Sequence, residues 1–508
     1  MSQLLTKKPE ESEPLLIPVF VNQHESALQA ASRVRSERFT VCCRLLILAL
    51  LSYVLFFSSH LSHHGDRQER DMAQKLDVFN KCSIQGFDKS ALKAPLVEPI
   101  PFDEFVHRRD RMAAALAEEG LDAYIIEPGS DFSYLANLSG WEDWGPTVLT
   151  ARLSHQERPF LLVVEPIFGS SDSKVKSKST ILTPKFELGR AQGLKLPFAD
   201  GDAKHLPWRE EQSPYEVLAS HLASSKAKAV NKIKVTVGPE TRTFISQGLT
   251  LANLEVVPYE EKSATAAVRQ MKSDREVAIM RAANTLTVEA IRSVRRCAFD
   301  GISEAELYDG YEQTVRSSGP GITDVEGLTL FGERTACPHC SASPDRKLNA
   351  LEDFILMDVG ARLFGYISDC TRTFLLPNQT DKAFDAEKLK IWNTVHTAQT
   401  AAIDAIREGT PLSDVDLAAR TVINKAGYGQ YFTHRLGHSI GISMHEAPYS
   451  NSGNTKTTLK VNTPLTAEPG IYIVDFGGVR IEDVILTTAG GKRAETLTNR
   501  RANSPWDP

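Results

Sequence analysis

Five side chains in the C-terminal half of this chain are of the types that bind metal ions. Asp358 and Asp369 lie eleven residues apart in the segment MDVGARLFGYISDCTRTF. The others are His438, Glu468 and Glu482. Four carboxylates and one imidazole form an oxygen-rich ligand set, which suits two adjacent hard or borderline divalent cations. These residues predict a dinuclear metal site, and the expected chemistry is hydrolysis by a metal-activated water.

The two aspartates lie in a predicted β-hairpin. Apolar, β-branched stretches at 354–360 and 366–375 flank a short turn at 361–365. Across two antiparallel strands, Asp358 and Asp369 would face each other and could share one small ion. Acidic residues at strand ends are common, so this pair alone is a weak signal.

The two glutamates repeat the arrangement. Stretches at 471–474 and 479–486 flank a turn at 475–478, which would place Glu468 and Glu482 near opposite positions of a second hairpin. Four carboxylates that converge among apolar strands repel one another strongly. A metal would resolve that conflict, and so would open solvent.

Four motifs resemble those of the pita-bread metallopeptidases, the family of aminopeptidase P, prolidase, methionine aminopeptidase and creatinase. They are DVGARLFGYISDCTRTF, HRLGHSIGISMHEAP, TAEPGIY and GVRIED. The resemblance covers roughly residues 262–490, with a weaker extension over 100–260. It implies an α/β (α+β) protein: a pita-bread catalytic domain at 262–508, with a curved antiparallel sheet backed by helices, after a smaller α/β creatinase-type domain at 100–260. Such a domain is also compatible with a homodimer.

The resemblance assigns roles to the five ligands. It implies that Asp358 binds one metal, whereas His438 and Glu468 hold mainly the other. Asp369 and Glu482 would bridge both. Because carboxylates dominate the set, Mn²⁺ is the expected metal, although Co²⁺, Fe²⁺ and Zn²⁺ tolerate similar ligands. Creatinase-like members lack the complete set, so its presence here argues against a metal-free mechanism.

The implied reaction is peptide-bond hydrolysis. A hydroxide held between the two ions would attack the scissile carbonyl, and Glu468 would accept the water proton. His339 and His445 match two non-ligand histidines that contact the substrate in the family, and His434, which opens the HRLGH segment, is a further candidate for substrate binding. Arg480 lies two residues before the last glutamate and would orient that carboxylate or bind substrate.

Substrate preference follows from the same resemblance. Most members with this layout cleave the bond before proline, in an Xaa-Pro peptide or an Xaa-Pro dipeptide. A dipeptidase needs a cation for the substrate's terminal carboxylate, but Tyr449 stands where some prolidases have arginine, and Lys456 and Lys460 are only loose substitutes. The sequence slightly favours a general Xaa-Pro peptidase. A non-catalytic peptide-binding pseudoenzyme and a hydrolase of a nonpeptide amide are the alternatives.

Cysteine and histidine motifs elsewhere give no second site. The CPHC segment at 337–340 has thioredoxin-type spacing but precedes a loop-like Ser-Ala-Ser-Pro, so we expect a disulfide or unpaired thiols there. HRLGH lacks the glutamate of helical zinc motifs, and Pro448 disfavours a helix after His445. Five cysteines beyond residue 43 do not indicate a disulfide framework.

The N-terminal hundred residues differ in character from the rest. We expect a mobile polar tail at 1–40, a single-pass membrane anchor at the apolar segment 41–59 and a polar stalk at 60–99. The catalytic portion would then be lumenal or extracellular. The segment ESEPLL at 11–16 resembles an acidic dileucine signal for endosomal or vacuolar sorting.

The composition suits an enzyme with large cores. The chain has 508 residues, 42% apolar and 24% charged, which is enough for two or more folded domains. Its net charge of −6, without a basic stripe, gives no electrostatic footprint for nucleic acid. Apolar periodicity predicts strands at 123–127 and 160–165 and long helices at 102–119, 273–298 and 304–317.

Overall fold

The computed structural model describes residues 69–508, except 95, 139–157, 169–173, 199–202, 225–231 and 378–383. The predicted tail at 1–40 and the predicted anchor at 41–59 lie outside the described residues. Within the described part of the chain, no helix combines the length and the apolar character needed to cross a membrane. Residues 76–508 form one unit, and the following description concerns that unit.

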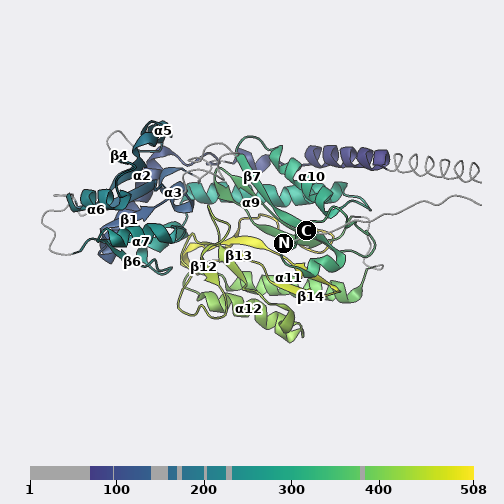
Figure 1. Ribbon diagram of the computed structural model, residues 1–508. Coiled ribbons are helices and arrows are strands. Elements are labelled where there is room, and N and C mark those ends of the chain that lie inside the picture. Colours follow the sequence, from purple (N-terminus) through teal and green to yellow (C-terminus); the bar gives the residue numbers. More distant parts are fainter. Residues whose placement is uncertain are drawn as a thin grey trace, which may run out of the picture. The chain divides into compact units, whose positions relative to one another are not determined.

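The first sheet of this unit has six strands in the order β4-β3-β2-β1-β5-β6 (Figure 1). Its strands are β1 (Ala123–Ile126), β2 (Leu161–Phe168), β3 (Val175–Pro184), β4 (Ala203–Trp208), β5 (Lys234–Val237) and β6 (Glu255–Val257). The strands β1 and β2 agree with the predicted positions. Alternate residues of β1 enter different apolar clusters, Tyr124 one and Ile125 the other, so both faces of the sheet are buried.

Helices cover both faces of this sheet. They are α2 (Phe102–Glu119), α3 (Ser130–Ala136), α5 (Leu188–Gly193), α6 (Pro214–Ser224), α7 (Thr243–Leu251) and α8 (Ala264–Gln270). The predicted helix at 102–119 is confirmed. It ends at Gly120, whose left-handed backbone closes the last turn.

The second sheet carries the aspartates. It has the order β10-β8-β7, with β9 paired to β8. The strands are β7 (Ile322–Phe331), β8 (Ile355–Leu363), β9 (Tyr366–Ile367) and β10 (Cys370–Phe374). The expected turn at 361–365 is shorter, because positive φ angles at Phe364 and Gly365 allow a two-residue turn and let β8 continue to Leu363.

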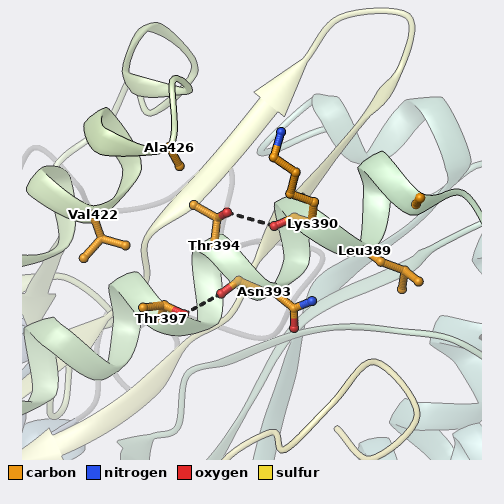
Figure 2. A pocket seen from close by; sticks show the side chains of 8 residues that line it. Leu389, Lys390, Asn393, Thr394, Thr397, Val422 and Ala426 are labelled. Atoms are coloured by element: carbon orange, nitrogen blue, oxygen red, sulfur yellow. Dashed lines mark hydrogen bonds between the residues drawn. The ribbon is translucent and has the colours of Figure 1, made fainter.

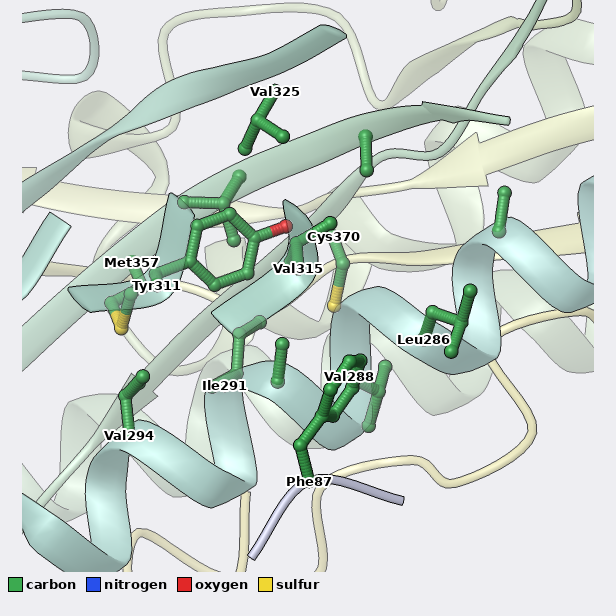
Figure 3. Close-up of a cluster of buried hydrophobic side chains, with 14 of the residues drawn as sticks. Phe87, Leu286, Val288, Ile291, Val294, Tyr311, Val315, Val325, Met357 and Cys370 are labelled. Carbon is green, nitrogen blue, oxygen red and sulfur yellow. The ribbon is translucent and has the colours of Figure 1, made fainter. Parts of the chain in front are cut away.

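Two long helices pack on the second sheet. Both predicted helices are confirmed as α9 (Asp274–Cys297) and α10 (Glu304–Arg316), and each begins with a capping box, at Ser273 and at Ser303. Figure 3 shows side chains from α9 and α10 meeting those of β7, β8 and β10 in one apolar cluster, with Ile291, Tyr311 and Met357 among them. The cluster fixes the sheet that contains Asp358, in β8, and that Asp369 adjoins at the start of β10.

The C-terminal part consists of helices and short strands around another apolar cluster. These elements are α11 (Ala386–Ala405), α12 (Leu412–Lys425), β11 (Gly437–Ser439), β12 (Glu446–Ser450), β13 (Pro464–Ala467), β14 (Gly470–Ile473), β15 (Gly477–Arg480), β16 (Asp483–Leu486) and β17 (Glu495–Thr496). The 3-10 turns within the described residues are η1 (Ser90–Lys93), η2 (Lys185–Glu187), η3 (Gly332–Ala336), η5 (Gly429–Tyr431) and η6 (Ala489–Gly491). The α/β fold class predicted from the sequence is confirmed.

Part of the predicted stalk is packed against the rest of the unit. Phe79 is buried, and Cys82 forms a disulfide with Cys297 at the end of α9. A second disulfide joins Cys337 and Cys340. The Cys337–Cys340 disulfide is one of the two alternatives predicted for that segment. The Cys82–Cys297 disulfide was not predicted, because its residues are 215 apart in the sequence and no spacing rule reveals their pairing.

Candidate metal site

Three of the predicted ligands converge in the interior. Side-chain atoms of Asp369, His438 and Glu482 lie within 4.8 Å of one another, and all three residues are buried. Each comes from a different place: Asp369 directly precedes β10, His438 lies in β11 and Glu482 directly precedes β16. His438 Nε2 is 3.6 Å from Asp369 Oδ2. This group could hold a metal ion.

Glu468 lies beside this group. It occupies the short gap between β13 and β14, and its Oε1 is 3.3 Å from His438 Nε2. The hydroxyl of Thr466 donates a hydrogen bond to the same oxygen at 3.1 Å. The β13·β16 ladder pairs Ala467 with Asp483, so the neighbouring positions Glu468 and Glu482 continue opposite each other, as the second hairpin predicted.

Asp358 lies in β8 but is offset from Asp369. The register pairs Asp358 with Thr371 and Val359 with Cys370, so the two aspartates are diagonal neighbours and do not face each other directly. The predicted direct facing was wrong, because the shorter turn shifts the pairing. Asp358 Oδ2 instead accepts a hydrogen bond from Arg480 Nη2 at 2.5 Å.

Arg480 ties the carboxylates together. It is buried, and its Nε donates to Thr371 Oγ1 at 3.0 Å while its Nη1 donates to Tyr472 OH at 2.8 Å. The Thr371 hydroxyl in turn donates to Glu482 Oε2 at 2.7 Å. Arg480 therefore contacts Asp358 directly and Glu482 through Thr371, which one guanidinium can do because its donors point in several directions.

The electrostatics of the cluster fit a divalent cation. Burial, followed by the charges of neighbouring carboxylates, raises the pKa of Asp369 and of Glu482 well above the ordinary values. Burial also raises the pKa of Glu468 to about 7. The single guanidinium of Arg480 does not balance four crowded carboxylates, so they cannot all be ionised together in a dry site without a further positive charge. A divalent ion would supply that charge, so the donor set fits a metal.

His438 is oriented as a metal ligand. Burial lowers its pKa to about 3, so the ring is neutral. Its Nδ1 lies 3.0 Å from the carbonyl oxygen of Ser439, and because a carbonyl only accepts, Nδ1 carries the proton. The lone pair on Nε2 is thus directed toward Asp369 and Glu468, as in metal sites whose second imidazole nitrogen bonds to a carbonyl.

The three other predicted histidines lie around the cluster. The His445 ring centroid is 4.3 Å from that of His438. His434 forms a hydrogen bond between its Nε2 and Tyr472 OH at 3.0 Å, and burial lowers its pKa to about 4. His339 is exposed between the bonded Cys337 and Cys340. His445 therefore lies beside the predicted ligand His438, His434 contacts Tyr472, and His339 lies on an exposed loop.

A cavity of about 220 Å³ opens beside His445. Its lining includes Tyr124, Asp131, Tyr259, Glu261, Arg269 and Tyr449. Arg269 donates to Asp131 of α3 at 2.6 Å and to Glu446 of β12 at 2.5 Å. It therefore connects the region of the first sheet to the C-terminal part of the unit. The sequence did not single out Arg269, because it belongs to the short helix α8 and to no motif.

The ion pairs of the buried Glu446 should make the stability of the protein depend on pH. Burial alone would raise its pKa, but the charges of Arg269 and Lys272 outweigh burial and lower it from 4.5 to about 2. A lowered pKa stabilises the folded state at pH values above the pKa of the unfolded chain. The ionised Glu446 therefore contributes about 3 kcal/mol to the free energy of unfolding near pH 7, and this contribution is lost as the pH falls from about 4.5 to 2. We expect Glu446→Gln to lower the melting temperature at pH 7. The difference between the melting curves of the two proteins should be constant from pH 7 to about pH 5 and shrink as the pH falls toward 2; a difference that does not shrink would contradict the prediction.

A second depression of about 510 Å³ lies on α11 and α12 (Figure 2). Hydroxyls of Thr394 and Thr397 there donate to the carbonyl oxygens of Lys390 and Asn393, at 2.8 Å each. Its lining has no histidine or carboxylate among the described residues, and Lys390 pairs with Glu387 outside it. Of these two cavities, only the one beside His445 is therefore lined by histidine and carboxylate side chains.

Comparisons with known proteins identify the family of the chain. Residues 278–489 match metallopeptidase family M24, and residues 108–328 match the creatinase/prolidase N-terminal domain. An uncharacterized peptidase of Schizosaccharomyces pombe is 41% identical over 415 residues, which are 80% of this chain and 84% of that protein.

Solved structures extend the similarity to the fold. A dipeptidase from Pyrococcus horikoshii OT3 is 30% identical with a TM-score of 0.61, over 77% of this chain and 97% of that one. A recombinant prolidase from Thermococcus sibiricus is 26% identical with a TM-score of 0.63, over 80% of this chain and 99% of that one. The predicted pita-bread fold with a creatinase-type N-terminal domain is confirmed.

Proposed function

This chain belongs to metallopeptidase family M24, and from that premise we propose that it hydrolyses the peptide bond before proline in Xaa-Pro peptides. The observation that carries the proposal is the buried convergence of Asp369, His438 and Glu482, with Glu468 beside them and a cavity at His445. The similarity to a solved prolidase supports the proline preference.

The five predicted ligands are the residues that would hold two divalent ions, with Mn²⁺ as the first choice. Bound there, the ions would lower the pKa of a water molecule and polarise the scissile carbonyl. Arg480 fixes the position of Asp358 through a hydrogen bond of 2.5 Å, and the hydroxyls of Thr371 and Thr466 orient Glu482 and Glu468. These contacts preset the carboxylate positions before substrate binds.

The remaining polar groups would handle the proton and the substrate. Glu468 is the carboxylate that we propose accepts the water proton, because it lies beside the ligand group, with its Oε1 at 3.3 Å from His438 Nε2. His445 and His339 would donate hydrogen bonds to the substrate around the cleaved bond. His434 is held by a hydrogen bond to Tyr472 and would form part of the substrate-binding surface next to His445 and His339.

The test combines metal analysis with an activity panel. Purified full-length protein should contain divalent metal by mass spectrometry and should cleave Xaa-Pro substrates faster than matched Xaa-Ala substrates. Metal-loaded protein that cleaves no proline peptide but hydrolyses other amides would favour the nonpeptide alternative. Protein that binds Xaa-Pro peptides without turnover would favour the pseudoenzyme.

The cellular placement is a separate proposal. We propose a lumenal or extracellular catalytic portion behind the predicted anchor at 41–59, a segment outside the described residues. The two disulfides support an oxidising compartment, because such bonds are rare in the reducing cytosol. Membrane anchoring, dileucine-directed sorting and a homodimer stay predictions.

A further inference from the structure

The loop that carries His339 is closed at its tip by a disulfide. Cys337 and Cys340 are bonded to each other, and only Pro338 and His339 lie between them. The ring of Pro338 fixes its own φ angle, so the closed loop leaves few backbone conformations for the next residue. The side chain of His339 is exposed, so its place depends on the backbone of this loop more than on packing against neighbours.

Both ends of this loop are anchored in the fold. Before it, the hydroxyl of Thr335 in η3 accepts a hydrogen bond from the backbone N–H of Gly478 in β15 at 2.7 Å. After it, the carbonyl oxygen of Ser341 accepts one from Arg334 Nη2 at 2.8 Å. Arg334 is itself paired with the fully buried Glu304 at 3.0 Å. The disulfide therefore closes the one part of the loop that these contacts do not fix.

The closed loop contacts the candidate metal site through Arg480. The Nη2 atom of this buried arginine donates to the carbonyl oxygen of Pro338 at 3.3 Å and to Asp358 Oδ2 at 2.5 Å. One nitrogen thus joins a predicted metal ligand to the residue directly before His339. The backbone that carries His339 is consequently held beside the carboxylates that would bind the metal.

The two disulfides found among the described residues differ in what they can stabilise. Cys82 and Cys297 are 215 positions apart in the sequence, whereas Cys337 and Cys340 are three apart. A cross-link restricts the unfolded chain more as the loop that it closes grows longer. The Cys337–Cys340 disulfide therefore contributes less to the stability of the whole fold, and its main effect is on the local conformation of the loop.

We propose that Cys337 and Cys340 are positioning residues, whose disulfide holds His339 where its imidazole meets the substrate at the cleaved bond. The proposal rests on the proposed Xaa-Pro function. A donor that is already in place needs no ordering when the transition state forms, whereas the donor of an open loop must first be ordered. The disulfide therefore acts through His339, and on the chemical step more than on substrate binding.

The test is a cycle of variants of the metal-loaded full chain, assayed on the best Xaa-Pro substrate of the activity panel. We expect Cys337→Ser combined with Cys340→Ser, the serine pair, to lower kcat by about 10- to 100-fold, as a misplaced catalytic group does, while KM changes by less than about threefold. His339→Ala should lower kcat by about 10²- to 10³-fold. In the His339→Ala protein, the serine pair should cost less than about twofold more, because no imidazole is left to position.

Ser341→Ala is the matched control. It changes an exposed residue next to the disulfide and keeps the backbone carbonyl that Arg334 contacts, so its kcat should equal that of the wild type. Metal content should be the same in all variants. A phosphine reductant should lower the kcat of the wild type to that of the serine pair and leave the serine pair unchanged. Equal losses from the serine pair with and without His339 would overturn the proposal, as would a reductant that lowers kcat equally in the wild type and the serine pair.

Hydrogen–deuterium exchange gives a readout without turnover. The backbone N–H of Cys337 donates to the carbonyl oxygen of Arg334 at 3.0 Å, so its exchange reports whether the loop opens. Peptides covering 335–340 should exchange at least about threefold faster in the serine pair than in Ser341→Ala. If the wild type cleaves no Xaa-Pro peptide, the proposed function fails, while faster exchange would still support a loop fixed by the disulfide, and unchanged exchange would overturn it.

Discussion

Replacing Asp369 with asparagine is expected to reduce Xaa-Pro hydrolysis by at least about 10³-fold, because substitutions that merely support metal ligands already cost about 10- to 100-fold. Asp369 approaches His438 to 3.6 Å and belongs to the group whose ligand atoms lie within 4.8 Å. Asparagine keeps the shape of the side chain but removes the charge that a divalent ion needs. Steady-state hydrolysis and metal content by mass spectrometry measure the effect.

The same substitution should not unfold the protein. Burial and the neighbouring Asp358 and Glu468 raise the pKa of Asp369, so its ionised form is unfavourable without metal. In chelator-treated protein, Asp369→Asn should melt at the wild-type temperature or above it, and added Mn²⁺ should stabilise only the wild type. Asp404→Asn, at an exposed ion pair with Arg493, is the control with unchanged activity. Metal binding and turnover retained by Asp369→Asn would exclude this residue as a ligand.

Local patterns made much of the fold predictable. The long helices have their start signals in the sequence: Ser273 and Ser303 are each followed three residues later by glutamate, and the structure forms capping boxes at both. The helix ending at Gly120 could be read in the same way. These signals involve residues only a few positions apart, so they can be recognised in a single sequence.

Long-range contacts were not predictable in the same way. The two-residue turn at Phe364 and Gly365 shifted the register, which moved Asp358 away from a position opposite Asp369. The Asp358–Arg480 ion pair joins residues 122 apart, and Tyr449 receives Arg435 only after β11 and β12 have paired. The ligand types could be predicted because they belong to motifs, but their partners depend on tertiary packing.

A buried ion pair joins β10 and β16, the strands that directly follow Asp369 and Glu482. Arg372 of β10 and Asp483 of β16 are both fully buried, with Arg372 Nη2 at 2.7 Å from Asp483 Oδ1. Arg372 also donates to the carbonyl oxygen of Glu482 at 2.5 Å. Asp483 accepts further hydrogen bonds, from Thr498 at 2.5 Å and from Gln399 at 2.8 Å. Such a pair positions its two strands only while both charges are present.

Arg372→Met is therefore expected to lower the free energy of unfolding by about 3–5 kcal/mol, because it leaves the buried Asp483 with only the more distant Arg501, at 3.9 Å, as an ionic partner. Asp483→Leu should cost a similar amount through Arg372. The double substitution should cost clearly less than the sum, since it leaves no uncompensated charge. Urea unfolding of the wild type, the two single variants and the double variant, all treated with chelator, gives the coupling energy of the pair. The same cycle at the exposed pair Lys390–Glu387 is the control, and its coupling energy should be near zero. Strict additivity at Arg372 and Asp483 would mean that their ion pair does not join β10 to β16 energetically.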